Sequence, residues 1–148
     1  MPNTLERPVT VYVAEDNPIL LQGLERALTA NGYRVETAED GSALLGLIGS
    51  MGIPDVLLLD VMMPGKTGVE VLDAVRSDRR TAELPVLLIT AATEEVVPAS
   101  ALAHAKVDML LKPFRLTDLL SRLESQVRES RKSKGGLPGG DAVAPLPG

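Results

Sequence analysis

Polar side chains close four apolar stretches of this sequence, and their types suit phosphoryl chemistry. Glu15 and Asp16 follow VTVYVA, Asp60 follows VLLL, Thr90 ends PVLLIT, and Lys112 follows VDMLL. Crowded carboxylates repel one another, so they share protons or recruit a cation, and hard oxygen ligands favour Mg²⁺. A lysine ammonium and a threonine hydroxyl can bind further phosphoryl oxygens. The set predicts a Mg²⁺-dependent phosphoryl site with Asp60 as the nucleophile.

Five short apolar stretches are expected to form the strands that position these side chains. Their ranges are 9–14, 33–37, 56–60, 85–90 and 107–111. Continuous apolar runs in at least three of them indicate burial on both faces, as in a parallel sheet. The carboxyl ends of parallel strands share one edge, where open α/β sheets bind ligands at the point at which strand order reverses. With the order 2-1-3-4-5, the first and third strands flank that point, and Glu15, Asp16 and Asp60 come together.

Helical periodicity separates the strands. Asn17 and Pro18 read as an N-cap and a first helical residue, and Asp40 and Gly41 open a second helix. Further helices are expected after PGKTG, over 94–105 and over about 116–127. The predicted apolar stripes contain Ile19, Leu20, Leu24, Ala27 and Leu28 in the first helix, Leu44, Leu45, Leu47 and Ile48 in the second, and Val69, Val71, Leu72 and Val75 in the third. Alternation predicts an α/β fold: a doubly wound, five-stranded parallel sheet of flavodoxin-like order 2-1-3-4-5, with helices on both faces.

Composition limits the class of protein. The chain has 148 residues, no cysteine and no signal-like start, and no apolar run approaches the ~20 residues of a membrane span. We therefore expect a cytoplasmic protein with no membrane partner. A net charge of -5 and only three aromatic residues, two Tyr and one Phe, argue against direct nucleic acid binding by this domain. Residues 1–130 are expected to form the domain and 131–148, rich in Gly and Pro, a flexible tail or linker.

Four ordered motifs resemble the receiver domain of bacterial two-component response regulators, of the chemotaxis-regulator-like kind. They are EDN, DVMMPGKTG, TA and KPF, and the resemblance spans about residues 8 to 128. It implies that Asp60 accepts a phosphoryl group from a sensor histidine kinase or phosphotransfer protein. It implies no enzyme activity beyond the chain's own phosphorylation and dephosphorylation.

The resemblance also assigns roles to the other site residues. Glu15 and Asp16 match the acidic pair that binds Mg²⁺ together with Asp60, and the backbone carbonyl of Met62 matches a further ligand. Thr90 matches the hydroxyl that follows the phosphoryl group, and Lys112 the lysine that contacts it. Pro113 matches a cis proline, which would aim Lys112 into the pocket.

Output is implied at the face formed by the fourth helix, the fifth strand and the fifth helix, through a homodimer or an effector. Met109 stands where the family usually has a Tyr or Phe that reports phosphorylation, and Thr67 where an acid is frequent. The alternative is a receiver-like interaction module whose output phosphorylation does not control. A haloacid-dehalogenase-like phosphatase would need an acid at Met62, and a flavodoxin-like carrier would need a phosphate loop where Glu15 and Asp16 stand.

Overall fold

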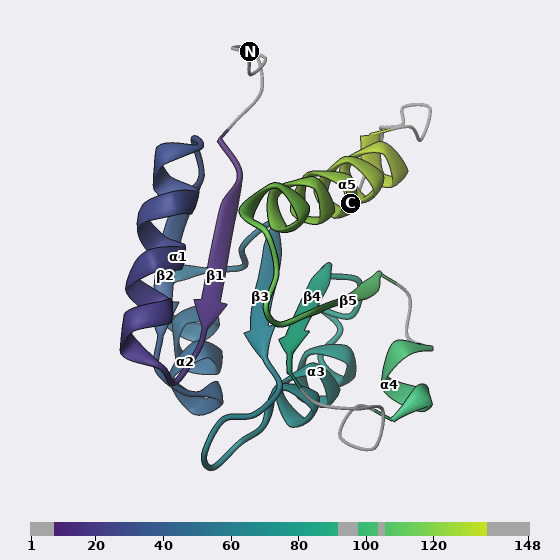
Figure 1. The fold of residues 1–148 in the computed structure, drawn as a ribbon. Helices are drawn as coiled ribbons and strands as arrows, with labels where there is room; N and C mark the ends of the chain where they lie inside the picture. The colour runs from purple at the N-terminus through teal and green to yellow at the C-terminus, as the bar shows by residue number, and fades with distance from the viewer. Residues whose placement is uncertain (1–7, 92–97, 104–105, 136–148) are drawn as a thin grey trace.

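A five-stranded parallel sheet in the order β2-β1-β3-β4-β5 organises the protein (Figure 1). The computed structural model describes residues 8–91, 98–103 and 106–135. The strands are β1 (Thr10–Ala14), β2 (Arg34–Ala38), β3 (Val56–Asp60), β4 (Val86–Thr90) and β5 (Val107–Leu111). The helices are α1 (Pro18–Ala30), α2 (Gly41–Met51), α3 (Gly68–Ser77), α4 (Ala99–Leu102) and α5 (Leu116–Gly135). The predicted fold and strand order are confirmed.

Two apolar clusters cover the two faces of the sheet, with α1 and α5 on one face and α2 and α3 on the other. Successive side chains of a strand point to opposite faces, so Leu57 and Leu59 join the α2–α3 cluster whereas Val56 and Leu58 join the α1–α5 cluster. This two-sided burial explains why the third strand is apolar at every position before Asp60. The buried strand gives Asp60 a fixed place at the edge of the sheet.

The first helix begins as the sequence predicts but turns one expected core residue outward. The Asn17 side chain caps α1 by accepting hydrogen bonds from the N–H groups of Ile19 and Leu20 at 3.0 and 3.2 Å. Ile19, predicted to face the core, is 81% exposed. The buried residue of this turn is Leu21, two positions after Ile19. Residues two positions apart in a helix lie about 200° apart around its axis, so Leu21 and Ile19 face nearly opposite sides. The buried stripe consists of Leu24 and Leu28, as predicted, with Leu21 in place of Ile19.

The last two helices differ in length from the prediction. Among the described residues of the fourth predicted segment, Ala99–Leu102 are helical, and 94–97 and 104–105 lie outside the described residues. The expected end of the fifth helix near Val127 is wrong, because α5 continues to Gly135. The first residues of the predicted tail are therefore helical. The division at residue 130 stays a prediction, and 136–148 lie outside the described part of the chain.

Asp55 joins the start of the first strand to the end of the last helix. Its Oδ2 accepts a hydrogen bond from the Thr10 N–H at 2.8 Å and lies 3.7 Å from Nη2 of Arg131. A partly exposed ion pair contributes little, about 0–1 kcal/mol, whereas a backbone N–H left without its acceptor costs about 1–3 kcal/mol. Asp55→Ala should therefore lower the free energy of unfolding, measured by urea denaturation, by about 1–3 kcal/mol. A variant as stable as wild type would show that the Thr10 hydrogen bond is unimportant.

Candidate metal and phosphoacceptor site

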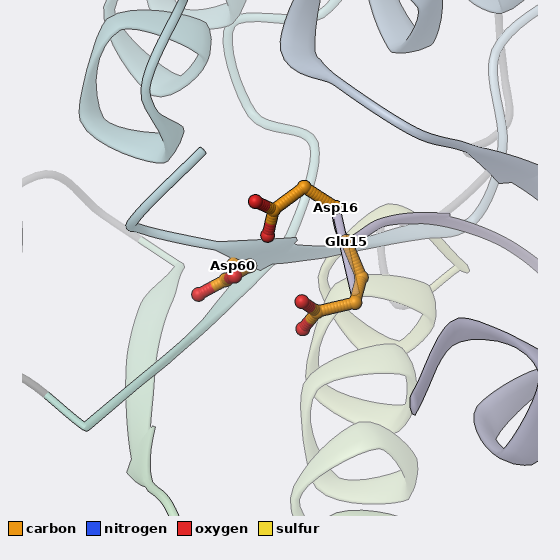
Figure 2. A group of neighbouring side chains, drawn as sticks. All are labelled: Glu15, Asp16 and Asp60. Atoms are coloured by element: carbon orange, nitrogen blue, oxygen red, sulfur yellow. The ribbon is translucent and has the colours of Figure 1, made fainter. Parts of the chain in front are cut away.

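Three carboxylates meet at the carboxyl edge of neighbouring strands, as Figure 2 shows. Glu15 and Asp16 directly follow β1, and Asp60 ends β3, which pairs with β1. One oxygen from each of the three groups lies within 4.8 Å of the others. Glu15 and Asp60 are only 1% and 3% exposed, whereas Asp16 is exposed. The structure thus brings together the three acids that the sequence predicts to be neighbours.

Lys112 extends its ammonium into this acidic group. Its Nζ lies 3.1 Å from Oε1 of Glu15 and 3.5 Å from Oδ1 of Asp60. The Lys112 N–H donates a hydrogen bond to the carbonyl of Thr90 at 2.9 Å, and the Lys112–Pro113 peptide bond is cis. Thr90 is fully buried and follows Ile89, which is opposite Asp60 in the sheet register. The two predicted phosphoryl-binding residues therefore lie at the same edge as the acids.

Glu15 is the most constrained of the acids. Its Oε2 accepts a hydrogen bond from the Asn17 N–H at 3.0 Å, while Oε1 faces Lys112. Burial raises the pKa of Glu15, and the neighbouring Asp60 adds to this rise, whereas the Asn17 N–H and the Lys112 ammonium oppose it. The contact of Lys112 with Glu15 as well as Asp60 was not part of the sequence prediction, since a strand-end position gives no side-chain direction.

The raised pKa predicts that ionised Glu15 costs stability when no metal is bound. Above the ordinary value of 4.5, folded Glu15 retains its proton more often than unfolded Glu15. Stability therefore falls as pH rises from that value through the raised folded pKa, and the loss is complete above it. In EDTA, Glu15→Gln should raise the free energy of unfolding at neutral pH and flatten this fall. Glu129→Gln, an exposed change of equal charge on α5, should do neither. Lower stability of Glu15→Gln at neutral pH would contradict the prediction.

The turn after Asp60 holds the carboxylate and its backbone in place. The N–H of Met62 donates a hydrogen bond to Oδ1 of Asp60 at 3.3 Å, and the Met62 side chain is 56% exposed. Thr67 caps α3 in a capping box with Glu70, which gives this departure from the family pattern a structural role. Gly68 packs so closely that an added Cβ would lie 2.6 Å from the carbonyl oxygen of Asp60. The sequence showed the Gly of this turn but not what it touches.

A largely apolar hollow of about 460 Å³ adjoins the acidic group. It is lined by Leu20, Ala91, Lys112, Pro113 and Phe114. Lys112 thus borders both the hollow and the carboxylates. These residues come from three separate loops and helices, so no local sequence pattern could have indicated the hollow.

The donor set fits Mg²⁺. Carboxylates of Glu15, Asp16 and Asp60 supply the hard oxygen ligands that this ion prefers, and it commonly retains several waters. The exposure of Asp16 leaves a path from solvent to the group. The excess of negative charge is only partly offset by Lys112, which is what a cation site requires.

Comparison with known proteins agrees with this geometry. Residues 11–124 match the response regulator receiver domain family. Response regulator MprA of Mycolicibacterium vanbaalenii is 38% identical over 128 residues, covering 86% of this chain and 54% of that protein. The solved structure of the chemotaxis protein CheY4 of Vibrio cholerae has a TM-score of 0.74 at 31% identity, covering 80% of this chain and 98% of that one.

The Francisella response regulator 1452 receiver domain gives a TM-score of 0.73 at 27% identity, covering 82% of this chain and 98% of that one. The chain spans about half the length of the curated relatives that it matches. No helix in the described residues is long and apolar enough to cross a membrane. The chain belongs to the response regulator receiver domains of two-component systems.

Proposed function

We propose that this chain is a Mg²⁺-dependent phosphoacceptor, and that Asp60 takes a phosphoryl group from a phosphohistidine of a sensor histidine kinase or phosphotransfer protein. The observation that carries the proposal is the position of Asp60, nearly buried between two further acids and an ammonium group. A rigid carboxylate in such surroundings is suited to nucleophilic attack on phosphorus. The only reaction that we assign to this chain takes place on its own Asp60 carboxylate.

The transfer is a substitution at phosphorus. An oxygen of Asp60 forms the new P–O bond while the P–N bond of the donor breaks and its electron pair returns to the imidazole nitrogen, which takes a proton from solvent. Oδ1 already faces the Met62 N–H and the Lys112 ammonium, so we assign the attack to Oδ2. Hydrolysis removes the phosphoryl group from Asp60, because water attacks phosphorus and releases phosphate and the free carboxylate.

The other residues neutralise charge and orient the group. Glu15, Asp16, Asp60 and the Met62 carbonyl would hold Mg²⁺, which when bound neutralises charge on the phosphoryl oxygens. Lys112 exchanges its contacts with Glu15 and Asp60 for a phosphoryl oxygen. The Thr90 hydroxyl donates a hydrogen bond to another oxygen.

Output is proposed at the surface of α4, β5 and α5, where a second copy or an effector binds. Three leucines there, Leu102, Leu111 and Leu116, are 37%, 55% and 42% exposed. Met109 is partly buried against the α2–α3 cluster, where an unbranched side chain fits several packings. This favours a less sharp response at this surface than an aromatic residue would give.

The test is labelling with acetyl phosphate, followed by intact mass. Wild type should gain one phosphoryl group with Mg²⁺ and none in EDTA. Asp16→Asn should need at least ~10-fold more Mg²⁺ for the same rate, because loss of a ligand costs no less than loss of an outer partner. Asp73→Asn, an equal charge change at an exposed site on α3, should behave like wild type.

Two results would contradict either the Mg²⁺-dependent phosphorylation or its control of output. Labelling that persists in EDTA would contradict Mg²⁺ dependence. Labelling without any effect on effector binding or self-association would favour the alternative, an interaction module whose output phosphorylation does not control.

A further inference from the structure

The strand β5 is the last strand of the sheet, so within the described residues it pairs with another strand on one side only (Figure 1). The carbonyl of Lys106 accepts a hydrogen bond from Val86 of β4, and the N–H of Lys112 donates one to Thr90. Backbone groups alternate in direction along a parallel strand, so those of the residues between, at odd positions, face away from β4. Met109 is the middle one of these outward-facing residues.

Two side chains occupy both outward backbone groups of Met109. Its N–H donates a hydrogen bond to Oδ1 of Asp108 at 2.8 Å, and its carbonyl accepts one from Nη1 of Arg122 at 2.8 Å. The same Nη1 lies 2.9 Å from Oδ1 of Asp108, which closes the ring. A carboxylate on β5 and a guanidinium on α5 together cover the centre of the strand edge.

The Asp108–Arg122 ion pair contributes little to the stability of the fold. The Arg122 and Asp108 side chains are 44% and 41% exposed, and ion pairs so exposed add little to folding. An edge strand with open N–H and C=O groups, in contrast, is a template for pairing with another chain. The ring occupies two of the outward backbone groups that such pairing would use, those at the centre of the strand.

We propose that the Asp108–Arg122 pair keeps β5 closed against the β5 strand of a second copy of this chain. Two such strands running antiparallel about a two-fold axis would place one Met109 opposite the other, so that each N–H meets the other's C=O. Leu111, the next odd-numbered residue of β5, is 55% exposed, and that pairing would cover part of it. The proposal concerns the unphosphorylated protein and does not depend on the chemistry at Asp60.

The test is sedimentation velocity of Arg122→Ala over a range of concentrations, without phosphodonor. This variant should self-associate at concentrations at which wild type keeps its mass, and its Met109 amide should exchange more slowly as concentration rises. Arg128→Ala is the matched control, because it removes the same charge from the same helix together with an exposed ion pair to Glu124 on that helix. It should sediment like wild type.

Two further variants make the result decisive. Arg122→Lys keeps the charge but has a shorter side chain without the Nη1 that donates to both acceptors, so it should also associate and serves if Arg122→Ala fails to fold. Adding Leu111→Lys to either variant should restore the mass of wild type, since charge on an edge blocks pairing. Arg122 variants that associate no more than wild type, or association that Leu111→Lys leaves unchanged, would overturn the proposal.

Discussion

Replacing Lys112 with methionine is expected to slow phosphorylation of Asp60 by about 100-fold or more, because one preorganised charge on a transferring group is worth about that much. Methionine keeps the apolar stem beside Pro113 and Phe114 but removes the ammonium. The measurement is the rate of phosphoryl incorporation from acetyl phosphate at saturating Mg²⁺. The control is Lys106→Met, which changes the same charge at the other end of β5, where Lys106 contacts Glu83.

The same variant separates two roles of Lys112. Its ammonium competes with a cation for Glu15 and Asp60, at 3.1 and 3.5 Å. Lys112→Met should therefore bind Mg²⁺ more tightly than wild type while transferring the phosphoryl group more slowly. A variant within a few-fold of the wild-type rate would show that Lys112 does not act on the phosphoryl group. Weaker Mg²⁺ binding would show that its ammonium does not compete with the cation.

Gly68→Ala is expected to destabilise the protein by about 2–3 kcal/mol, the cost of forcing an extra carbon into a packed site. The new Cβ would lie 2.6 Å from the Asp60 carbonyl oxygen and 2.9 Å from Cα of Val61. Both contacts are backbone atoms of the segment that carries the phosphoacceptor, so neither can rotate away. Relief requires α3 or Asp60 to shift, and phosphorylation should slow as well.

Gly46→Ala provides a control of opposite sign. Gly46 lies on the exposed side of α2, and a Cβ there meets nothing within 4 Å. Alanine in a helix interior should stabilise by roughly 0.5–1 kcal/mol. Urea denaturation of both variants gives the comparison. A Gly68→Ala protein as stable as wild type would mean that the turn after Asp60 is more yielding than its packing indicates.

The fold was predictable from local signals that agree with one another. Apolar runs of strand length, the caps Asn17 and Asp40, and the polar residues that close four of the five strands all indicate the same sheet. The edge that gathers Glu15, Asp16 and Asp60 follows from parallel strands alone. These features depend on neighbours in sequence, or on a topology that the alternation of elements already fixes.

What could not be predicted depends on contacts between distant segments. The sequence of the first turn does not determine whether Ile19 or Leu21 faces the core. The packing of Leu21 against the sheet sets the rotation of α1 about its axis. The length of α5 was hidden because Ser130 and Arg131 look like linker residues, yet Ser130 is buried and Arg131 reaches Asp55. The covered edge of β5 joins Asp108 to a residue fourteen positions later on another element.

The location of the phosphoryl group tests the central claim most directly. Wild type is treated with acetyl phosphate and Mg²⁺, and then with borohydride, which reduces an aspartyl phosphate to homoserine. Peptide mapping should find homoserine at position 60, and Asp60→Asn should gain no phosphoryl mass under the same conditions. Homoserine at Asp16 or elsewhere, or full labelling of Asp60→Asn, would contradict the assignment of Asp60 as the phosphoacceptor.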